Sequence, residues 1–410
     1  MHDRSHHVEH FVSVDGLALD GIRVIDLSRV LAGPFCGALL GDMGADVIKV
    51  EDTRGGDESR TWPPQRDGEA AAYLDNNRNK RGIAVDLKAP DGVEIIRRLV
   101  ERADVLVENF RTGTMESFGL GYDALAELQP RLVYCSISAF GRTGPRADSG
   151  GYEAVMQAFS GVMSITGEPG GAPVRCGVSF LDLATGVFGA FGVVNALLRR
   201  HVTGRGQRVD TSLLETSISL LNYHAQGYLL AGVVPQALGS SHPSIVPYRN
   251  FRCRDGGWVF IAGANDRLWQ RLAGAIGLEH LVKDPRFLTN PDRVRHRTAL
   301  EAEVETAIAR HDEEPLLALL AAADVPAVPV NTVDRVLGDA QCAAREMIER
   351  VQHPTLGEVP IVGVPVKFSD MRPSVRTPAP LLGEHTDEVL AEHGYSAARI
   401  ADLRTRKIVV

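Results

Sequence analysis

Short apolar runs alternate with amphipathic helical patterns through the first half of the chain, and this alternation constrains the fold more than any other feature. The runs cover residues 23–27, 47–51, 83–87, 105–108 and 132–136. The helical patterns cover residues 34–43, 90–102 and 122–128. Buried strands separated by helices of this length predict βαβ units and therefore an α/β fold with a parallel sheet.

A longer helical pattern begins at Asp182, ends near residue 201 and precedes a predicted strand at 207–211. Asp182 is the single carboxylate of a short apolar segment. An aspartate at a helix start can cap the first backbone N–H groups, and the positive end of the helix dipole keeps it ionised. The local sequence therefore fits either an ordinary N-cap or a carboxylate nucleophile.

Glycine recurs at every third position of this helix, at Gly186, Gly189 and Gly192. Each glycine costs a helix about 1 kcal/mol relative to alanine, so the repeat needs a reason. One reason is close approach of a ligand or of another backbone. The other is tight packing of the helix on the sheet.

The pattern changes after about residue 225, which predicts a second, smaller α+β domain. Its predicted parts are a loop at 239–244, antiparallel strands at 248–253 and 258–262, and helices between 266 and 323. A strand at 359–362 and a helix near 387–392 follow. We expect a disordered tail (1–18), a large domain (19–224), the small domain (225–330) and a return to the large domain (331–410).

Composition and short motifs argue against several classes of function. The net charge of −8 argues against nucleic acid as a partner. Five cysteines without a C-x-x-C pair point to a reducing, cytoplasmic compartment and no zinc site. We expect no membrane span and no signal peptide, because no uninterrupted run of about 18 apolar residues occurs. Dinucleotide and P-loop functions lack their G-x-G-x-x-G and Walker A sequences.

Many separate segments, in order along the chain, carry a resemblance to one family. They are residues 24–34, 41–51, 56–57 with 60, 77–81, 86–88, 108–111, 150–152, 177–186, 203–207 and 381–386. In these segments the chain resembles the class III CoA-transferases, over roughly residues 20–410. Within the family, residues 62–64, 177–186 and 242–248 are most similar to the succinyl-CoA:glutarate CoA-transferases, which implies a dicarboxylic acid as a substrate.

The resemblance implies a fold and a set of partners. The expected fold is a Rossmann-like large domain built from both chain ends, a small inserted domain, and an interlocked homodimer. The expected substrates are an acyl-CoA thioester and a carboxylic acid, with no metal and no permanently bound cofactor.

By the resemblance, Asp182 is the catalytic aspartate, which forms a mixed anhydride with the acyl group and then carries CoA as a thioester. Tyr152 and Glu153 occupy the active-site segment after the glycine pair. Glu153 would contact the substrate carboxylate or position a neighbour, unless it is a surface helix residue. The α-methylacyl-CoA racemases of the family carry His in place of Tyr152. A phenol with a reference pKa of about 10 is a poor base, which disfavours the racemase alternative. A non-catalytic CoA-binding subunit would have no need of Asp182.

The coenzyme A contacts of the family fall at the ends of predicted strands. They are Leu31, Ala32, Val85, Asp86, Lys88, Asn109, Phe110, Arg111 and Gly151. Lys88 and Arg111 would face phosphates, and Phe110 would pack against adenine or the pantetheine arm. Ligands of open parallel sheets do bind at the carboxyl ends of strands. The alternative is that these are solvated loop residues.

The chain departs from the formyl-CoA transferases of the family at three positions. Asp52 and Ser117 stand in place of Arg. The loss of two positive charges weakens the expected binding of the adenosine phosphate unless Arg54 or Arg111 substitutes. Leu31 stands in place of Gln, which argues against oxalate as a substrate.

Two further features stay open at the level of sequence. His242 lies in the loop 239–244, where it would touch substrate or only shape a turn. A dicarboxylate needs a cation for its far carboxylate, and the candidates are Arg78, Arg81 and Arg175.

Overall fold

The computed structural model describes residues 16–410, which form two compact units. The first contains the described chain up to Ser160, Gly177–Ala225 and Ala340–Val410, and the second contains Gly161–Cys176 and Gln226–Asp339. The segment Gly161–Cys176 groups with the second unit, a division that the sequence patterns did not indicate. The tail expected over residues 1–18 falls almost entirely outside the described residues.

A six-stranded sheet forms the centre of the first unit, and every neighbouring pair of its strands is parallel. In spatial order the strands are β5 (Lys80–Ala84), β2 (Asp46–Glu51), β1 (Arg23–Asp26), β6 (Val105–Glu108), β7 (Val133–Ser138) and β8 (Arg208–Ser212). The parallel sheet predicted from the alternating pattern is confirmed. The chain leaves β1 toward β2 and later returns to add β6 on the other side of β1, so the strand order reverses between β1 and β6.

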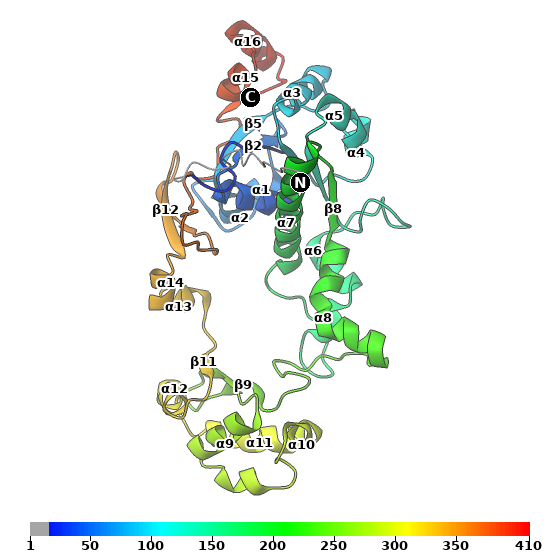
Figure 1. Cartoon of the computed structure of the whole chain (residues 1–410). Helices are drawn as coiled ribbons and strands as arrows, with labels where there is room; N and C mark the ends of the chain where they lie inside the picture. The colour runs from blue at the N-terminus through cyan, green and yellow to red at the C-terminus, as the bar shows by residue number, and fades with distance from the viewer. Residues whose placement is uncertain (1–15) are drawn as a thin grey trace, which may run out of the picture. The chain divides into compact units, whose positions relative to one another are not determined.

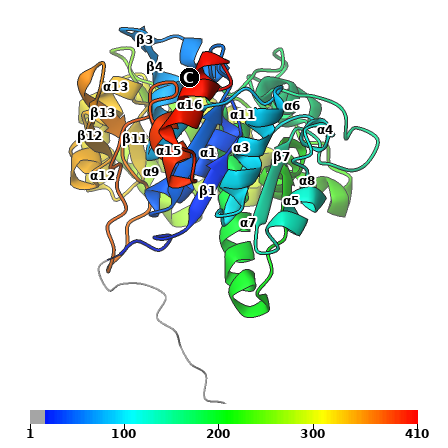
Figure 2. The ribbon, with the colours of Figure 1, turned by 90° about the horizontal axis from the view of Figure 1, so that it is seen from above.

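Helices cover both faces of this sheet, because successive strand residues point to opposite sides. On β1, Val24 packs with α1 (Ala32–Asp42) and α7 (Phe180–Thr203). Its neighbour Ile25 packs on the other face with α3 (Pro90–Val100), α5 (Tyr122–Leu128), α15 (Thr386–Glu392) and α16 (Ala397–Thr405). Figures 1 and 2 show the helices α3, α15 and α16 gathered on that second face.

The remaining elements of the first unit are short, apart from α8. They are η1 (Glu58–Thr61), β3 (Gln65–Arg66), β4 (Glu69–Ala70), α2 (Ala71–Asn76), α4 (Thr114–Ser117), α6 (Glu153–Phe159), α14 (Ala340–Ala344), β12 (Ile348–His353) and β13 (Gly357–Val362). The residues of α8 (Leu213–Ala231) divide between the two units.

The second unit is built on a three-stranded antiparallel sheet with the order β11-β10-β9. Its elements are η2 (Val162–Ile165), β9 (Tyr248–Arg252), β10 (Trp258–Ala262), α9 (Asp266–Ala275), η3 (Glu279–Lys283), α10 (Asn290–Arg295), α11 (Arg297–Ile308), α12 (Glu313–Ala322), β11 (Ala327–Pro329) and α13 (Val333–Leu337). The predicted hairpin of β9 and β10 is confirmed, whereas β11 was not predicted. Trp269 and Phe251 are fully buried in its core.

The glycines of α7 have a structural explanation. A Cβ at Gly186 would lie 2.7 Å from the carbonyl oxygen of Ala32, so the backbones of α7 and α1 approach closely there. At Gly192 a Cβ would meet a methyl group of Val209 on β8 at 2.6 Å. Gly186 therefore fits the close approach of another backbone, and Gly192 fits tight packing of the helix on the sheet.

Among the helices of residues 16–410, α7 alone is long and apolar enough to cross a membrane by length and composition. It contributes Val193 and Ala196 to the core beneath the sheet, and it carries Asp182 in its first turn.

Gly186→Ala is expected to lower the thermal unfolding midpoint. The added methyl group would force α1 and α7 apart, and such overpacking costs about 1–3 kcal/mol, more than the ~1 kcal/mol gained in helix propensity. Gly274→Ala in α9 is the control, because a Cβ there meets nothing within 4 Å and should stabilise its helix. Equal midpoints for Gly186→Ala and the unaltered protein would contradict the close approach.

Candidate active site

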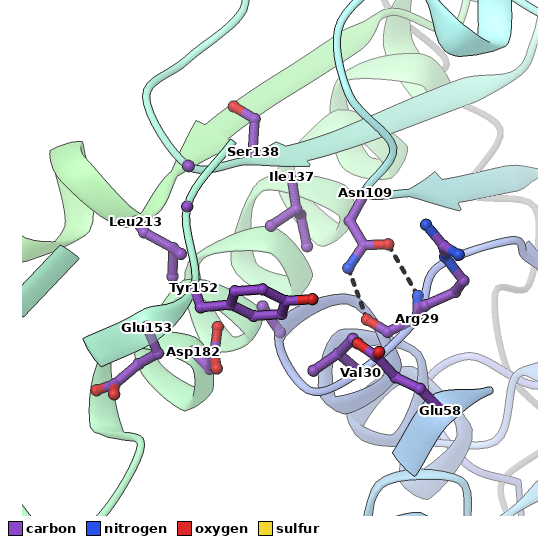
Figure 3. Close-up of a pocket in the computed structure, with 13 residues that line it drawn as sticks. Arg29, Val30, Glu58, Asn109, Ile137, Ser138, Tyr152, Glu153, Asp182 and Leu213 are labelled. Atoms are coloured by element: carbon purple, nitrogen blue, oxygen red, sulfur yellow. Dashed lines mark hydrogen bonds between the residues drawn. The ribbon is translucent and has the colours of Figure 1, made fainter. Parts of the chain in front are cut away.

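The candidate site lies at the carboxyl ends of β1 and β6, where the strand order reverses and where open parallel sheets bind ligands. A cavity of about 170 Å³ opens there. Its lining residues are Arg29, Val30, Ala32, Glu58, Asn109, Ile137, Ser138, Ala139, Gly151, Tyr152, Glu153, Asp182 and Leu213 (Figure 3). They come from the end of β7, from the loops after β1, β6 and β7, and from the starts of η1, α1, α6, α7 and α8.

Asp182 is buried on the wall of this cavity, with 9% of its surface exposed. The N-cap of α7 is Ser179, so Asp182 is the third residue of the helix and the N-cap interpretation is wrong. The first-turn N–H groups and the positive end of the helix dipole still favour its charged form. The contact of Gly186 with Ala32 brings the next turn of α7 against the start of α1.

Glu153 and Tyr152 line the same cavity from the start of α6. Glu153 is 5% exposed and accepts a hydrogen bond from Nε2 of Gln157 at 2.6 Å, which rules out the reading of a surface helix residue. Tyr152 is 66% exposed. Its ring extends across the cavity toward Arg29 and Asn109 in Figure 3.

The loops after β1 and β6 are tied to each other through their backbones and side chains. The N–H of Arg29 donates to Oδ1 of Asn109 at 2.8 Å, and Nδ2 of Asn109 donates to the carbonyl oxygen of Arg29 at 2.7 Å (Figure 3). The Arg29 guanidinium lies 5.0 Å from the centre of the Phe110 ring. Among residues 16–410, Arg29 is the only cationic side chain on this cavity.

Glu108, the last residue of β6, fixes the loop after β6 through hydrogen bonds to its carboxylate. Its carboxylate accepts the N–H of Phe110 at 2.9 Å and hydrogen bonds from Ser136 and Arg142. Burial raises the pKa of Glu108 above its usual value, although the Arg142 charge opposes the shift.

Two further cavities adjoin the first through shared lining residues. A cavity of about 300 Å³ includes Val85, Asp86, Lys88 and Phe110, and it shares Arg29 with the Asp182 cavity. A third, of about 380 Å³, is lined by Arg111 and shares Asn109, Gly151 and Tyr152 with the Asp182 cavity. Phe110 lines both of these cavities.

The structure therefore brings together most of the residues expected to contact coenzyme A. Ala32, Asn109 and Gly151 line the Asp182 cavity. The second cavity is lined by Val85, Asp86, Lys88 and Phe110, and the third by Arg111. Leu31 is the exception, since it is absent from the lining of these three cavities within the described part of the chain.

The departures at Asp52 and Ser117 have different structural settings. Asp52 pairs with Arg54 on the wall of the second cavity, through Nη2 to Oδ2 at 2.9 Å and Nε to Oδ1 at 3.1 Å. The hydrogen bonds from Arg54 lower the pKa of Asp52. The pair places a guanidinium on this wall but largely balances its charge. Ser117 donates to the carbonyl oxygen of Thr114 within α4.

Two of the three cations proposed for a far carboxylate are paired with acids of the chain itself. Arg78 is buried and pairs with Asp42 at 2.8 Å, and Arg81 pairs with Asp46 at 2.8 Å, so both candidates are wrong. Arg175 belongs to the second unit.

His242 shapes the turn in its loop. Its Nδ1 accepts the N–H of Ser244 at 3.0 Å, and its ring packs edge-on against Tyr248. In the part of the chain that the structure describes, no cluster of three His, Cys, Asp or Glu residues could hold a metal ion.

Arg29, Val30 and Glu58 line the cavity but were not among the residues predicted for the site. The sequence could have indicated Arg29 and Val30, because they come shortly after the predicted strand β1, just as Asn109 and Phe110 come after β6. Ligands bind at these carboxyl ends of parallel strands. Glu58 lies between Asp57 and Arg60, two residues that carry the resemblance, but no local pattern showed that it lines the same cavity as Asp182.

Comparisons with known proteins agree on one family. The family model described as CoA-transferase family III matches residues 19–386. A succinate–glutarate CoA-transferase of Agrobacterium fabrum is 41% identical over 91% of this chain and 95% of its own length. Human succinyl-CoA:glutarate CoA-transferase is 38% identical over 91% of this chain and 85% of its own. A crystal structure of a CaiB/BaiF family protein from Brucella suis superposes with a TM-score of 0.84 at 40% identity, covering 92% of this chain and 100% of that one.

Phe110→Ala is expected to weaken binding of coenzyme A by about tenfold, because stacking of a base on an aromatic ring contributes about 1–3 kcal/mol. Isothermal titration with coenzyme A measures the change. Phe368→Ala removes an exposed ring outside the three cavities and should bind normally. Unchanged affinity in Phe110→Ala would show that the ring does not contact the ligand.

Proposed function

The chain belongs to CoA-transferase family III, and from this premise we propose that it moves CoA from succinyl-CoA to a second dicarboxylic acid. CoA transfer between acids is the activity that the names of its relatives share. The observation that carries the proposal is the position of Asp182, a buried carboxylate on a cavity that adjoins two larger ones at the carboxyl edge of the sheet. Those two cavities offer room for the nucleotide and the pantetheine arm.

The proposed reaction begins when a carboxylate oxygen of Asp182 attacks the thioester carbonyl carbon of the donor. CoA leaves as the thiolate, and a mixed anhydride joins Asp182 to the donor acyl group. The thiolate then attacks the Asp182 carbonyl carbon, which forms an aspartyl-CoA thioester and releases the donor acid. Acceptor carboxylate attacks this thioester, and the same two steps in reverse give the new acyl-CoA and restore Asp182. Each intermediate conserves the activation of the acyl group.

The other cavity residues have proposed roles that follow from their places. Glu153 lies beside Asp182 and would position the substrate carboxylate, and Tyr152 would cover the reacting centre from the solvent side. Exclusion of water is essential, because water would hydrolyse both the anhydride and the thioester. The racemase alternative is not favoured, since a phenol at Tyr152 is a poor base and the similar proteins named above are CoA-transferases.

We also propose that two copies of the chain associate through α7. The helix exposes an apolar face along its length, formed by Val187, Phe191, Val194, Leu198 and Val202. These residues follow helical spacing, and Phe191 and Leu198 are 67% and 65% exposed. A continuous exposed apolar face marks an interaction surface, which supports the homodimer implied by the resemblance.

Mass spectrometry of protein incubated with succinyl-CoA and a pool of carboxylic acids should detect a new acyl-CoA that identifies the acceptor. Asp182→Asn should fold, bind CoA and lose transfer by roughly 10³-fold or more, as expected for loss of a nucleophile. Asp123→Asn is the control, because Asp123 also lies in the first turn of a helix but outside the cavities. Transfer by Asp182→Asn at a normal rate would refute the assignment.

Sedimentation analysis should give a dimer for the unaltered protein and a monomer when Phe191 and Leu198 are both replaced by Asp, because charge on the apolar face opposes its burial. Leu288→Asp changes an exposed leucine of the second unit and should leave the dimer intact. A monomeric unaltered protein, or a dimer that survives both changes on α7, would contradict this interface.

A further inference from the structure

Gly56, Asp57 and Arg60 belong to the segments that resemble the family, yet the proposed reaction gives them no task. The carboxylate among them, Asp57, is 1% exposed, although the residue belongs to the lining of the second cavity. Its carboxylate contacts three parts of the first unit: the loop after β1, the strand β2 and the short helix η1. This arrangement suggests that Asp57 acts through its neighbours.

The first neighbour is Val30, a residue of the Asp182 cavity. Its N–H donates to both carboxylate oxygens of Asp57, each at 3.1 Å. Val30 has a φ of 72°, a left-handed conformation that a β-branched residue adopts only when its surroundings impose it. The two hydrogen bonds from Val30 to Asp57 are such an imposed constraint.

The second neighbour is Lys49, which is fully buried on β2. Its Nζ lies 3.1 Å from Oδ2 of Asp57 and donates also to the carbonyl oxygen of Ser28. Burial alone would raise the pKa of Asp57, but the Lys49 charge and the hydrogen bonds from Ser59 outweigh it and lower that pKa. Asp57 therefore stays ionised, and one ion pair fixes the loop at Ser28 and at Val30.

The third neighbour is η1, whose N-cap is Asp57. Oδ1 of Asp57 accepts the N–H of Ser59 at 3.0 Å. The first residue of η1 is Glu58, which lines the Asp182 cavity. In Figure 3, Val30 and Glu58 lie on one side of the cavity, and Asp182 and Glu153 lie on the other. One buried carboxylate thus sets both residues of this wall.

We propose that Asp57 is a positioning residue that keeps this wall closed to water while Asp182 carries the acyl or CoA group. The inference rests on the proposed function. When the wall loosens, water competes with the acceptor for the aspartyl-CoA thioester. Water adds a hydroxyl group to the thioester carbonyl carbon, the carbon–sulfur bond breaks, and the water's remaining proton leaves with CoA as the thiol. The energy of the thioester is then lost without transfer.

The test measures how the unaltered protein and Asp57→Asn divide succinyl-CoA between transfer and hydrolysis in one reaction with an acceptor acid. Once the hydrolysis measured without enzyme is subtracted, the ratio of hydrolysis to transfer does not depend on how much enzyme is folded, so a purely structural role leaves it unchanged. We expect the ratio to rise roughly tenfold to a hundredfold, the scale of a small misplacement at a reacting centre. An unaltered ratio would overturn the proposal.

Two more variants complete the test. Val30→Gly keeps the Asp57–Lys49 pair but releases the strained wall, so it should raise the ratio even if Asp57→Asn does not fold; a normal ratio there overturns the proposal. Asp104→Asn is the matched control, since Asp104 also accepts a backbone N–H, from Arg23 at 2.9 Å, and pairs with Arg200, but lies away from the cavity. A complete lack of transfer by the unaltered protein would refute the proposed function instead.

Discussion

The close approach of α7 to α1 is the contact on which the rest of the site depends. With glycine at 186, the second turn of α7 meets the start of α1, backbone against backbone. Asp182 lies one turn earlier on α7 and therefore faces the loop that leads from β1 into α1. Any side chain at Gly186 would separate the carboxylate from Val30 and Ala32, with which it shares a cavity. A packing constraint in the core thus sets the geometry of a reactive group.

Buried ion pairs fix the backbone around the loop that leads from β1 into α1. Lys80 pairs with Asp26 at 2.8 Å, and Lys49 pairs with Asp57 at 3.1 Å, with all four side chains almost completely enclosed. Burial lowers the pKa of Lys80 to about 8 although the Asp26 charge opposes it. Buried pairs of this kind contribute little net stability, because desolvation offsets their attraction. Their value here is positional, since each ammonium also holds a backbone carbonyl at the start of the site, Lys80 that of Pro34 and Lys49 that of Ser28.

The sequence predicted the parts of the molecule that local pattern encodes. The strand 105–108 and the helix 122–128 have the predicted bounds, because apolar spacing and turn residues determine them. The strand predicted at 83–87 instead begins at Lys80. Its first residues, Lys80 and Arg81, are charged and form ion pairs with Asp26 and Asp46. They therefore do not belong to the apolar run from which the strand was predicted. That pairing also explains why Arg81 was a wrong choice for a substrate cation. The contact between Val30 and Asp57 joins residues 27 positions apart, and no local pattern could show it.

The central claim is that Asp182 forms a covalent anhydride first with the donor acyl group and later with the acceptor acid. Labelling the acceptor acid with an oxygen isotope tests this claim most directly. In the proposed reaction the bridging oxygen of the second anhydride comes from the acceptor carboxylate and stays on Asp182 when the new thioester leaves. With an acceptor acid labelled with ¹⁸O in its carboxylates, mass spectrometry should find the heavy isotope in the peptide that contains Asp182 and in no other peptide. Formation of the new acyl-CoA without label in that peptide would contradict the account.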